Sequence, residues 1–349
     1  MALNKEKISF GLDFSDQVLR LVQLKRIGKT IQLKAFGRIM VPNGKIVEGE
    51  IQDEKTVIKL VKKLCHQAKG NLLSKNVVAS LPERKSFIKV IELPKDSAKD
   101  YKAVKKQIPL HVPLNLEEIY FDYQELSNHK KNQVIIAATP KKIADTYTTV
   151  LEKAGLSPFA LEIESVAISR SLTGYGKDKQ TAKLIVDIGK VRSTFIVSQG
   201  ETVLFIISNQ EISGQAMTDT IAKELKLSKK EAEKAKIICG LEKSSGKGKV
   251  RKVLSPTVKK LKEKIREAIS YYQNNFSGDK IDFLILCGGS SQLKGLVPEL
   301  KENLSKDINK VFLAAPDNNF QSKKVSIPKT EILSYTTAIG LALRGANHD

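Results

Sequence analysis

The chain contains the same local pattern twice, at positions separated by roughly half its length. Residues 8–14 alternate apolar and polar side chains and carry Asp13, and residues 18–24 repeat the alternation after a short turn. Residues 183–189 form a second such strand, which carries Asp187, and residues 193–197 and 201–208 follow as its return strands. Alternation of this kind is typical of half-buried strands in hairpins. Because internal repetition constrains a fold more than a single motif does, we predict two similar α/β halves, each opening with an acid-bearing hairpin.

A third turn combines a buried strand, two glycines and a helix. Residues 284–287 are apolar, Gly288 and Gly289 follow them, and apolar residues at helical spacing come next, namely Leu296, Val297, Leu300 and Leu304. Glycine lets the backbone approach a flat or anionic ligand, and a helix start offers unpaired N–H groups. The same pattern also suits a tight strand–helix connection without a ligand, so the motif alone leaves both interpretations open.

The remaining elements follow from periodicity and from caps. In the first half we expect a strand over residues 31–41, a helix capped by Asp53 that ends near Gly70, and a strand over residues 77–81. Residues 86–157 predict a small α+β insert. Its expected parts are strands at 87–93, 119–125 and 133–138, a helix capped near Asp96 or Ser97 that stops at Pro109, and a helix with Thr139 as cap, Pro140 first and Gly155 after its end.

After the insert, a strand over residues 160–164 leads into a helix over 165–172. The second half adds helices at 213–225 and 228–239, a basic loop at 243–252, and a long helix capped by Ser255 and Pro256 that closes near Gly278. The last helix is expected from about Thr330.

The net charge of +21 is the strongest compositional signal. Such a surface attracts nucleic acid or an anionic leaflet, or only confers solubility. The chain has no tryptophan, and its basic clusters lack interleaved aromatic residues for base stacking. A solvated basic face is therefore the favoured interpretation, proximity to a membrane surface comes second, and nucleic-acid binding is disfavoured.

Several features favour a cytoplasmic protein. No apolar run approaches the ~18–20 residues that span a bilayer, and no apolar signal segment precedes the first predicted strand. Cys65, Cys239 and Cys287 lie in apolar or helical stretches and are interpreted as reduced packing residues. The four histidines show no metal-ligand spacing with them.

The three turns resemble, in order and type, those of the actin-like ATPase superfamily, within it the branch of pilus-assembly PilM proteins and the division protein FtsA. Residues 11–13 are similar to the family's first phosphate loop, residues 186–189 with Thr194 to its second, and residues 288–296 to its adenosine motif. Gly214 and Thr218, with residues 231–236, resemble the helix pair that flanks the nucleoside. Residues 335–344 resemble the closing helix of PilM proteins.

The resemblance implies an actin-like (ribonuclease H-like) duplicated α/β fold, with two domains around a nucleotide cleft and an extra α+β subdomain of the FtsA/PilM type. The implied boundaries are 1–85, 158–180 and 329–349 for subdomain 1A, 86–157 for the inserted subdomain 1C, 181–212 and 279–328 for subdomain 2A, and 213–278 for the helical subdomain 2B.

The implied cofactors are ATP and Mg²⁺. By resemblance, Asp13 and Asp187 lie by Mg²⁺, Glu164 lies near the attacking water so that Glu164 and Asp187 are the catalytic residues, and Glu233 and Lys236 lie beside the ribose or base. The full set implied to bind the nucleotide is Gly11, Asp13, Ser15, Asp16, Gln17, Asp187, Gly189, Thr194, Gly214, Glu233, Lys236, Gly288, Gly289 and Ser290. On pattern alone, Glu231, Glu233, Lys234 and Lys236 also suit a solvated helix with ion pairs.

The chain departs from the family pattern at the first loop. The family usually has glycine and then serine or threonine after Asp-x, whereas this chain reads Phe14-Ser15-Asp16. Like charge beside a phosphate costs on the order of 1 kcal/mol or more unless a cation offsets it. Ser213 also replaces the first glycine of a usual pair. We therefore expect weak nucleotide binding or binding without turnover, and at most a slow ATPase.

The implied function is a cytoplasmic scaffold of type IV pilus assembly, peripheral to the inner membrane, that binds ATP and holds the N-terminal tail of PilN in a groove by the insert. Other pilus-base proteins and, indirectly, the membrane surface are further expected partners; nucleic acid is not, and self-association is left open. The alternatives are an ATPase proper, an FtsA-like membrane-tethering protein of cell division, and a scaffold that no longer needs nucleotide. No amphipathic helix follows Arg344, which favours the pilus branch over FtsA.

Overall fold

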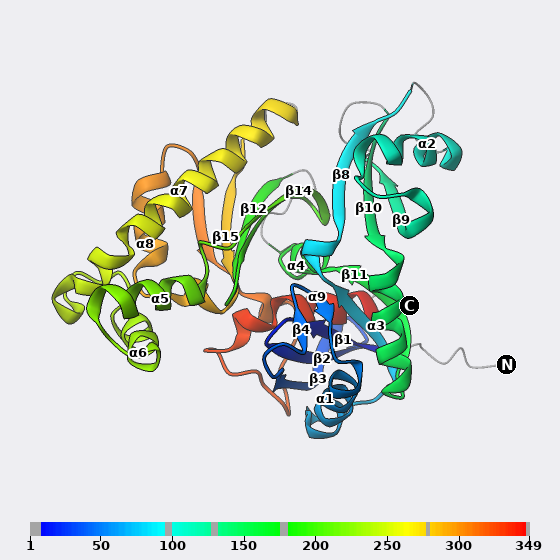
Figure 1. Ribbon diagram of the computed structural model, residues 1–349, viewed down its shortest axis with the longest axis horizontal. Coiled ribbons are helices and arrows are strands. Elements are labelled where there is room, and N and C mark those ends of the chain that lie inside the picture. Colours follow the sequence, from blue (N-terminus) through cyan, green and yellow to red (C-terminus); the bar gives the residue numbers. More distant parts are fainter. Residues whose placement is uncertain (1–7, 95–99, 127–131, 175–180, 277–279, 347–349) are drawn as a thin grey trace. The chain divides into compact units, whose positions relative to one another are not determined.

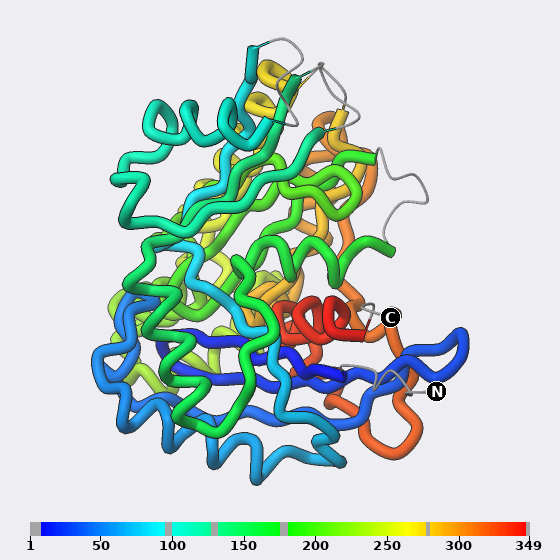
Figure 2. Tube along the Cα trace, turned by 90° about the vertical axis from the view of Figure 1, so that its right-hand side faces the viewer, coloured from blue at the N-terminus to red at the C-terminus, as the bar shows by residue number. Residues whose placement is uncertain are grey.

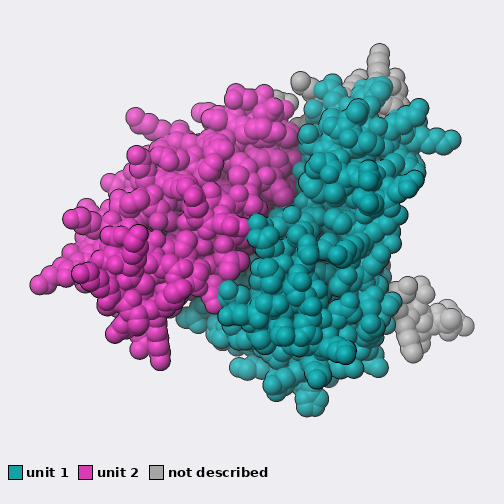
Figure 3. Space-filling view, viewed as in Figure 1, with its two compact units in different colours: residues 1–174, 316–349 teal, residues 175–315 magenta. Residues whose placement is uncertain are grey.

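The computed structural model describes residues 8–94, 100–126, 132–174, 181–276 and 280–346 (Figure 1). The chain divides into two compact units, residues 1–174 with 316–349 and residues 175–315 (Figure 3). The first unit is therefore built from both ends of the chain, and the second is one continuous segment. The finer subdomain boundaries stay a prediction. No described helix has the length and apolar content that crossing a bilayer demands.

The first unit contains a mixed six-stranded sheet in the order β11-β7-β1-β2-β3-β6. Its strands are β1 (Ser9–Phe14), β2 (Val18–Ile27), β3 (Thr30–Met40), β6 (Lys69–Gly70), β7 (Asn76–Leu81) and β11 (Ser157–Ile163). β2 pairs antiparallel with β1 and β3, whereas β7 runs parallel to β1 and β11. The strands predicted at residues 8–14, 18–24, 31–41 and 77–81 are confirmed.

Helices cover both faces of this sheet. They are α1 (Glu54–Gln67), α3 (Lys141–Lys153), α4 (Glu164–Ser171) and α9 (Thr336–Ala346). Successive side chains of a strand point to opposite faces. Phe10 and Leu12 accordingly share a core with α1 and α3, while Gly11 meets the backbone of α9. Figure 2 shows α9, in red, alongside the blue strands that open the chain.

Local caps explain where two of these helices begin and end. The Asp53 carboxylate accepts the Thr56 N–H at 2.9 Å, as predicted for the cap of α1. That helix ends at Gln67, shortly before the predicted end near Gly70, which lies in β6. Glu164, predicted at the end of a strand, is instead the first residue of α4.

The insert is a three-stranded antiparallel sheet in the order β8-β10-β9 with one helix on it. Its elements are β8 (Phe87–Glu92), α2 (Tyr101–His111), β9 (Ile119–Glu125) and β10 (Gln133–Pro140). Val104 and Ile108 of α2 join Ile91, Val134 and Ile136 in a core of its own. The predicted α+β character of the insert is confirmed.

Two helix starts and one helix end in the insert differ from the prediction. The expected caps Asp96 and Ser97 lie outside the described residues, and α2 begins after Asp100, which accepts the Lys102 N–H at 2.8 Å. α2 also continues through Pro109, because a proline in the last turn removes only one helical hydrogen bond. Thr139 belongs to β10 and does not cap α3, since its hydroxyl bonds that of Ser86 at 2.7 Å.

A short ribbon and the returning C-terminal segment complete the first unit. The ribbon pairs β4 (Ile46–Val47) with β5 (Glu50–Ile51) and was not predicted. Gln321 forms an isolated bridge with Gln32 of β3. The final helix, expected from about Thr330, is preceded by a 3₁₀ turn (Ile332–Tyr335), so its α-helical part begins at Thr336.

The second unit contains a five-stranded sheet in the order β14-β13-β12-β15-β16. Its strands are β12 (Ala182–Ile188), β13 (Ser193–Gln199), β14 (Thr202–Asn209), β15 (Phe283–Cys287) and β16 (Lys310–Leu313). β12, β13 and β14 form an antiparallel meander like that of β1, β2 and β3, and β15 runs parallel to β12. The predicted duplication of an antiparallel meander is therefore present; β16 was not predicted.

The helices of the second unit are α5 (Gly214–Leu225), α6 (Lys229–Cys239), α7 (Lys249–Asn275) and α8 (Leu296–Leu304). Ser228 and Glu231 form a capping box at the start of α6. α7 begins at Lys249, so Pro256 lies inside it and does not start it. Val250, Leu254 and Val258 are buried on both sides of Pro256, and this continuous apolar face outweighs the one hydrogen bond that the proline removes. The helix ends at Asn275, and Gly278 lies outside the described residues.

Candidate functional site

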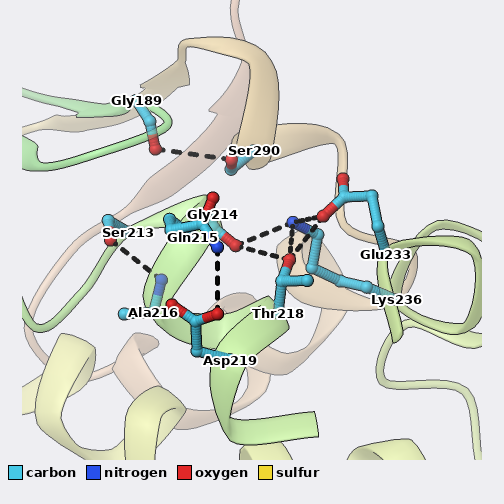
Figure 4. A network of polar contacts seen from close by, with 10 residues as sticks. All are labelled: Gly189, Ser213, Gly214, Gln215, Ala216, Thr218, Asp219, Glu233, Lys236 and Ser290. Atoms are coloured by element: carbon cyan, nitrogen blue, oxygen red, sulfur yellow. Dashed lines mark hydrogen bonds and ion pairs between the residues drawn. The ribbon is translucent and has the colours of Figure 1, made fainter. Parts of the chain in front are cut away.

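A buried lysine organises a polar cluster between α5 and α6 (Figure 4). Lys236 is 7% exposed, and its Nζ donates to the Gly214 carbonyl at 2.8 Å, to the Thr218 hydroxyl at 2.8 Å and to the Glu233 carboxylate at 2.7 Å. An ammonium group has three protons, so each has an acceptor. The buried charge is thus compensated by a carboxylate and two neutral oxygens.

Glu233 is the half-exposed member of this cluster, with 47% of its side chain exposed. Partial burial by itself raises the pKa of Glu233. The hydrogen bonds from Lys236 and Thr218, with the charge of Lys236, outweigh burial and hold the pKa of Glu233 below its ordinary value. Glu233 therefore presents an ionised, oriented carboxylate at the surface of the second unit.

The double-glycine turn lies beside the acid of β12. Gly288 has a φ of +80°, and a Cβ there would lie 2.1 Å from the Asp187 Oδ1, so the turn requires glycine on both counts. A Cβ at Gly289 would meet nothing within 4 Å. The turn therefore packs against Asp187 at Gly288 and is exposed at Gly289, which suits both a ligand site and a tight strand–helix connection.

Hydrogen bonds join this turn to α5. The Gly189 carbonyl accepts the Gly214 N–H at 3.0 Å and the Ser290 hydroxyl at 3.4 Å, and a Cβ at Gly214 would lie 2.2 Å from the Ser290 Oγ. Thr194 lies opposite Asp187 in the β12–β13 register. The structure thus brings together the predicted residues of the second unit, namely Asp187, Gly189, Thr194, Gly214, Glu233, Lys236, Gly288, Gly289 and Ser290.

Cys287 ends the strand under the same turn and lies opposite Asp187 in the β12–β15 register. Burial and, after it, the charge of Asp187 hold the pKa of the Cys287 thiol well above its ordinary value. A neutral thiol is a poor nucleophile, so this cysteine packs the strand, as predicted.

The hairpin of the first unit uses its polar groups within its own unit. Asp13 is 4% exposed, and its carboxylate pairs with Arg20 at 3.3 Å and lies 3.4 Å from the Ser80 hydroxyl. The Ser15 hydroxyl donates to the Val18 carbonyl at 2.9 Å. The Asp13 carboxylate already has the Arg20 guanidinium beside it, so a divalent metal would have to share this carboxylate with Arg20.

The rest of that turn is also tied to its surroundings. The Asp16 carboxylate accepts the N–H groups of Glu48 and Gly49 at 3.1 and 2.9 Å, and the Gln17 carbonyl accepts the Val41 N–H at 2.9 Å. Asp16 therefore anchors the β4–β5 ribbon.

Gly11 is explained by packing within the first unit. A Cβ at this position would lie 2.3 Å from the Ala338 carbonyl oxygen and 2.6 Å from the Ala342 nitrogen, both in the backbone of α9. Only glycine allows α9 to lie so close to β1. The ligand-binding role implied for Gly11 stays a prediction.

Sequence reasoning did not find Glu83, the buried partner of the segment that contains Glu164. Glu83 is 3% exposed and lies in the 3₁₀ turn Glu83–Lys85. Its carboxylate accepts the N–H and the hydroxyl of Ser165 at the start of α4. No local pattern marks it, because its partner is distant in the sequence.

The residues of the second unit fit a nucleotide with Mg²⁺ better than the first hairpin does. Mg²⁺ prefers oxygen ligands and keeps several waters, which suits the half-buried Asp187 carboxylate of the second unit. Asp13 pairs with Arg20, and Asp16 adds negative charge to the turn. Asp13 and Asp187 belong to different units, and their joint role at one metal stays a prediction.

Comparison with known proteins places this geometry in a family context. Residues 11–346 match the sequence model of the family described as type IV pilus assembly protein PilM. A structure of the PilM–PilN type IV pilus biogenesis complex superposes with a TM-score of 0.80 and 22% identity, over 98% of this chain and 99% of that chain. MreB5 of Spiroplasma citri bound to ADP gives a TM-score of 0.57 and 13% identity, over 97% and 95%. EutJ from Carboxydothermus hydrogenoformans gives 0.56 and 16%, over 96% and 89%. The predicted actin-like fold is confirmed.

Proposed function

Because the chain belongs to the family of type IV pilus assembly protein PilM, we propose that it is a cytoplasmic, ATP-binding scaffold of pilus assembly that holds the N-terminal tail of a PilN-like protein of the inner membrane. The observation that carries this proposal is the family match over residues 11–346. The likeness to a PilM–PilN complex over nearly all of both chains supports it.

The proposed nucleotide site uses residues of the second unit for the nucleoside. Glu233 would bind a ribose hydroxyl, and Lys236 would hold Glu233 in place, because its Nζ is fixed by three acceptors. Gly288, Gly289 and Ser290 would receive the adenosine, with the open space at Gly289 next to them. When bound, Mg²⁺ would supply positive charge to the phosphates, with Asp187 and Asp13 as its carboxylates.

Slow turnover is part of the proposal. Asp13 is engaged with Arg20, and Asp16 anchors the ribbon at Glu48 and Gly49. Fixed donors aimed at developing charge are what accelerates phosphoryl transfer, and this turn contributes carboxylates in their place. For this reason we expect turnover well below the ~1 per second at the low end of common enzymes. Within the proposal, Glu164 is the residue that positions the attacking water.

A scaffold that needs no nucleotide is the second candidate. It is favoured by the negative charge of Asp16 in the turn where a phosphate would approach. Like charge at the phosphate position weakens binding. The two candidates share the partner tail and differ only in whether ATP binds.

For the partner tail we propose the face of the insert's sheet that lies opposite α2. Side chains on α2's side of the sheet form the insert's core, so the alternate positions Ile88, Val90, Tyr120 and Ile135 lie on the other face, where each is half-buried or exposed. The same face also carries Asp122 and Gln124 of β9, so its apolar part is the strip along β8 and β10, which suits an extended tail with alternate apolar side chains.

Titration calorimetry of the full chain tests both parts. A synthetic peptide of the partner's N-terminal tail should bind, and Val90→Asp should weaken it at least tenfold while ATP binding stays unchanged. Lys102→Asp, an exposed change on α2, is the matched control and should bind the peptide normally. Asp187→Ala should weaken Mg·ATP binding and leave the tail bound.

The outcomes separate the candidates. Tail binding without any ATP binding supports the nucleotide-independent scaffold, and phosphate release faster than about 1 per second supports an ATPase proper. Failure of the tail to bind, with or without ATP, contradicts the scaffold.

A further inference from the structure

The outer face of α6 combines lysines with exposed isoleucines. Ile237 and Ile238 are each 60% exposed, and Lys230 and Lys234 are exposed on the same helix. These four residues have the spacing i, i+4, i+7 and i+8, which places them along one stripe of a helix. The opposite side of α6 is the buried one, with Ala232 and Lys236. In Figure 1, α6 lies at the edge of the second unit, away from its sheet.

A basic loop follows α6 and contacts the helix at Cys239, on the side away from this stripe. The loop contains the 3₁₀ turn Ser245–Gly248, and a Cβ at Gly246 would lie 3.2 Å from the Cys239 Sγ of α6. Lys243 and Lys247 are exposed in this loop. We call Lys230, Lys234, Ile237 and Ile238 the α6 surface.

The acidic residues near this surface already have partners. Glu231 is held in the capping box by Ser228, and the Glu242 carboxylate accepts the Ser245 hydroxyl at 2.9 Å. Two lysines, Lys230 and Lys234, lie on the same exposed stripe as the two adjacent isoleucines, opposite the buried side of α6. In water this leaves both isoleucines exposed without a compensating contact.

We propose that the α6 surface binds directly to an anionic membrane surface. Lysines beside exposed apolar side chains are the composition of helices that lie in the interface of a bilayer, where the apolar side chains enter the headgroup region and the ammonium groups meet lipid phosphates. The net charge of +21 favours the same partner. This contact would hold the protein at the membrane independently of the proposed PilN-like tail and of nucleotide.

The expected strength follows from the number of charges. Each lysine near an anionic leaflet strengthens binding about fivefold at moderate salt. The attraction acts within about 10 Å at 0.1 M salt and within about 3 Å at 1 M. Binding should therefore be strong at low salt, weak at high salt and absent on neutral lipid.

Vesicle co-sedimentation of the full chain, without partner or nucleotide, tests this proposal. The probe is a vesicle of phosphatidylcholine with one quarter phosphatidylglycerol, compared with pure phosphatidylcholine. Lys230→Gln with Lys234→Gln should weaken binding to the anionic vesicles about 25-fold. Ile237→Asn with Ile238→Asn should weaken it at least about tenfold.

A matched control distinguishes this surface from general net charge. Lys59→Gln with Lys62→Gln removes two exposed lysines from α1 and should change binding less than twofold. An equal loss in this control, or full binding by the isoleucine variant, would overturn the proposal. So would binding to an acidic peptide or to nucleic acid that the α6 changes abolish while vesicle binding persists.

A spectroscopic measurement covers the case in which the paired variants do not fold. The chain has no tryptophan, so Ile238→Trp creates a single fluorescent reporter at an exposed position. Its emission should shift to the blue with the anionic vesicles and stay unchanged with phosphatidylcholine alone. An emission maximum that stays at the wavelength of a hydrated indole with anionic vesicles contradicts membrane contact.

Discussion

The Glu83 carboxylate accepts hydrogen bonds from both the backbone N–H and the hydroxyl of Ser165, at 2.9 and 3.2 Å, across 82 positions of sequence. The first N–H groups of a helix have no partner inside the helix, and a carboxylate at that end also interacts favourably with the helix dipole. Glu83 follows β7 and immediately precedes the insert. The start of α4, where Glu164 lies, is thus fixed by the root of the insert.

Replacing Glu83 should destabilise the first unit. Glu83→Ala leaves the Ser165 N–H and hydroxyl buried without their acceptor, which costs about 1–3 kcal/mol of unfolding free energy. Urea denaturation followed by circular dichroism measures this loss. Glu117→Ala, an exposed glutamate of the insert, is the control and should change the unfolding free energy by less than about 0.5 kcal/mol. Equal stability of both variants would show that the cap does not contribute.

The close contact between β1 and α9 makes Gly11 sensitive to any side chain. Gly11→Ala forces the two elements apart, because the new Cβ would lie 2.3 Å from a carbonyl oxygen. Overpacking of this kind costs about 1–3 kcal/mol, visible as a lower thermal midpoint. Gly174→Ala, where a Cβ meets nothing within 4 Å, should leave the midpoint unchanged. A normal midpoint for Gly11→Ala would contradict the packing explanation.

Removing the buried ammonium group of Lys236 should destabilise the folded protein, because its three acceptors lose their donor. Lys236→Met leaves Gly214, Thr218 and Glu233 without this donor, and we expect a loss of about 1–3 kcal/mol in unfolding free energy. Lys234→Met on the exposed face of the same helix is the control. Chemical denaturation of both variants at neutral pH gives the comparison, and equal losses would argue against a role specific to Lys236.

Lys236→Met should also change how the unfolding free energy depends on pH in the acid range. The pKa of Glu233 is held low in the folded protein, so its contribution is present above the ordinary carboxyl pKa and is lost as the pH falls through the lower folded value. The stability gap between the wild type and Lys236→Met should therefore narrow as the pH is lowered from about 5 to about 3. A gap that stays constant over this range would show that Glu233 is not the linked group.

Tyr335 should limit stability at high pH. Burial raises the pKa of Tyr335 to about 12, with the charge of Glu331 acting in the same direction against Arg20 and Arg38. Above the ordinary pKa near 10 the unfolded chain loses this proton while the folded protein keeps it. The stability is therefore complete below about pH 10 and falls by about 2 kcal/mol as the pH approaches 12.

Tyr335→Phe should flatten this decline, and absorbance at the phenolate band should lose one group that titrates near pH 12. Tyr101→Phe, at a position 51% exposed, serves as the control and should keep the decline. A difference titration that places Tyr335 near pH 10 would contradict the effect of burial.

Local sequence patterns were sufficient for the long strands of both sheets and for some helix ends, such as those of α5 and α6. Residues 8–14 alternate apolar and polar side chains, and residues 184–186 are a continuous apolar run, both of which indicate strands. Ser228 with Glu231 forms a cap within one turn of chain. Predictions failed where a distant contact replaced the local one. Thr139 bonds Ser86 and does not cap α3, and the buried face of α7 continues across Pro256.

The sequence by itself determined the duplicated meanders and the insert, because their strands and turns show in local patterns, whereas the need for glycine at position 288 also comes from the distant Asp187 carboxylate. Only the tertiary structure decided that Lys236 binds Gly214, that Gly11 lies against α9 and that Glu83 caps α4. Each of those contacts joins segments that are far apart in the chain. These segments lie close together because of how the sheets and helices pack, and no local pattern of residues contains that information.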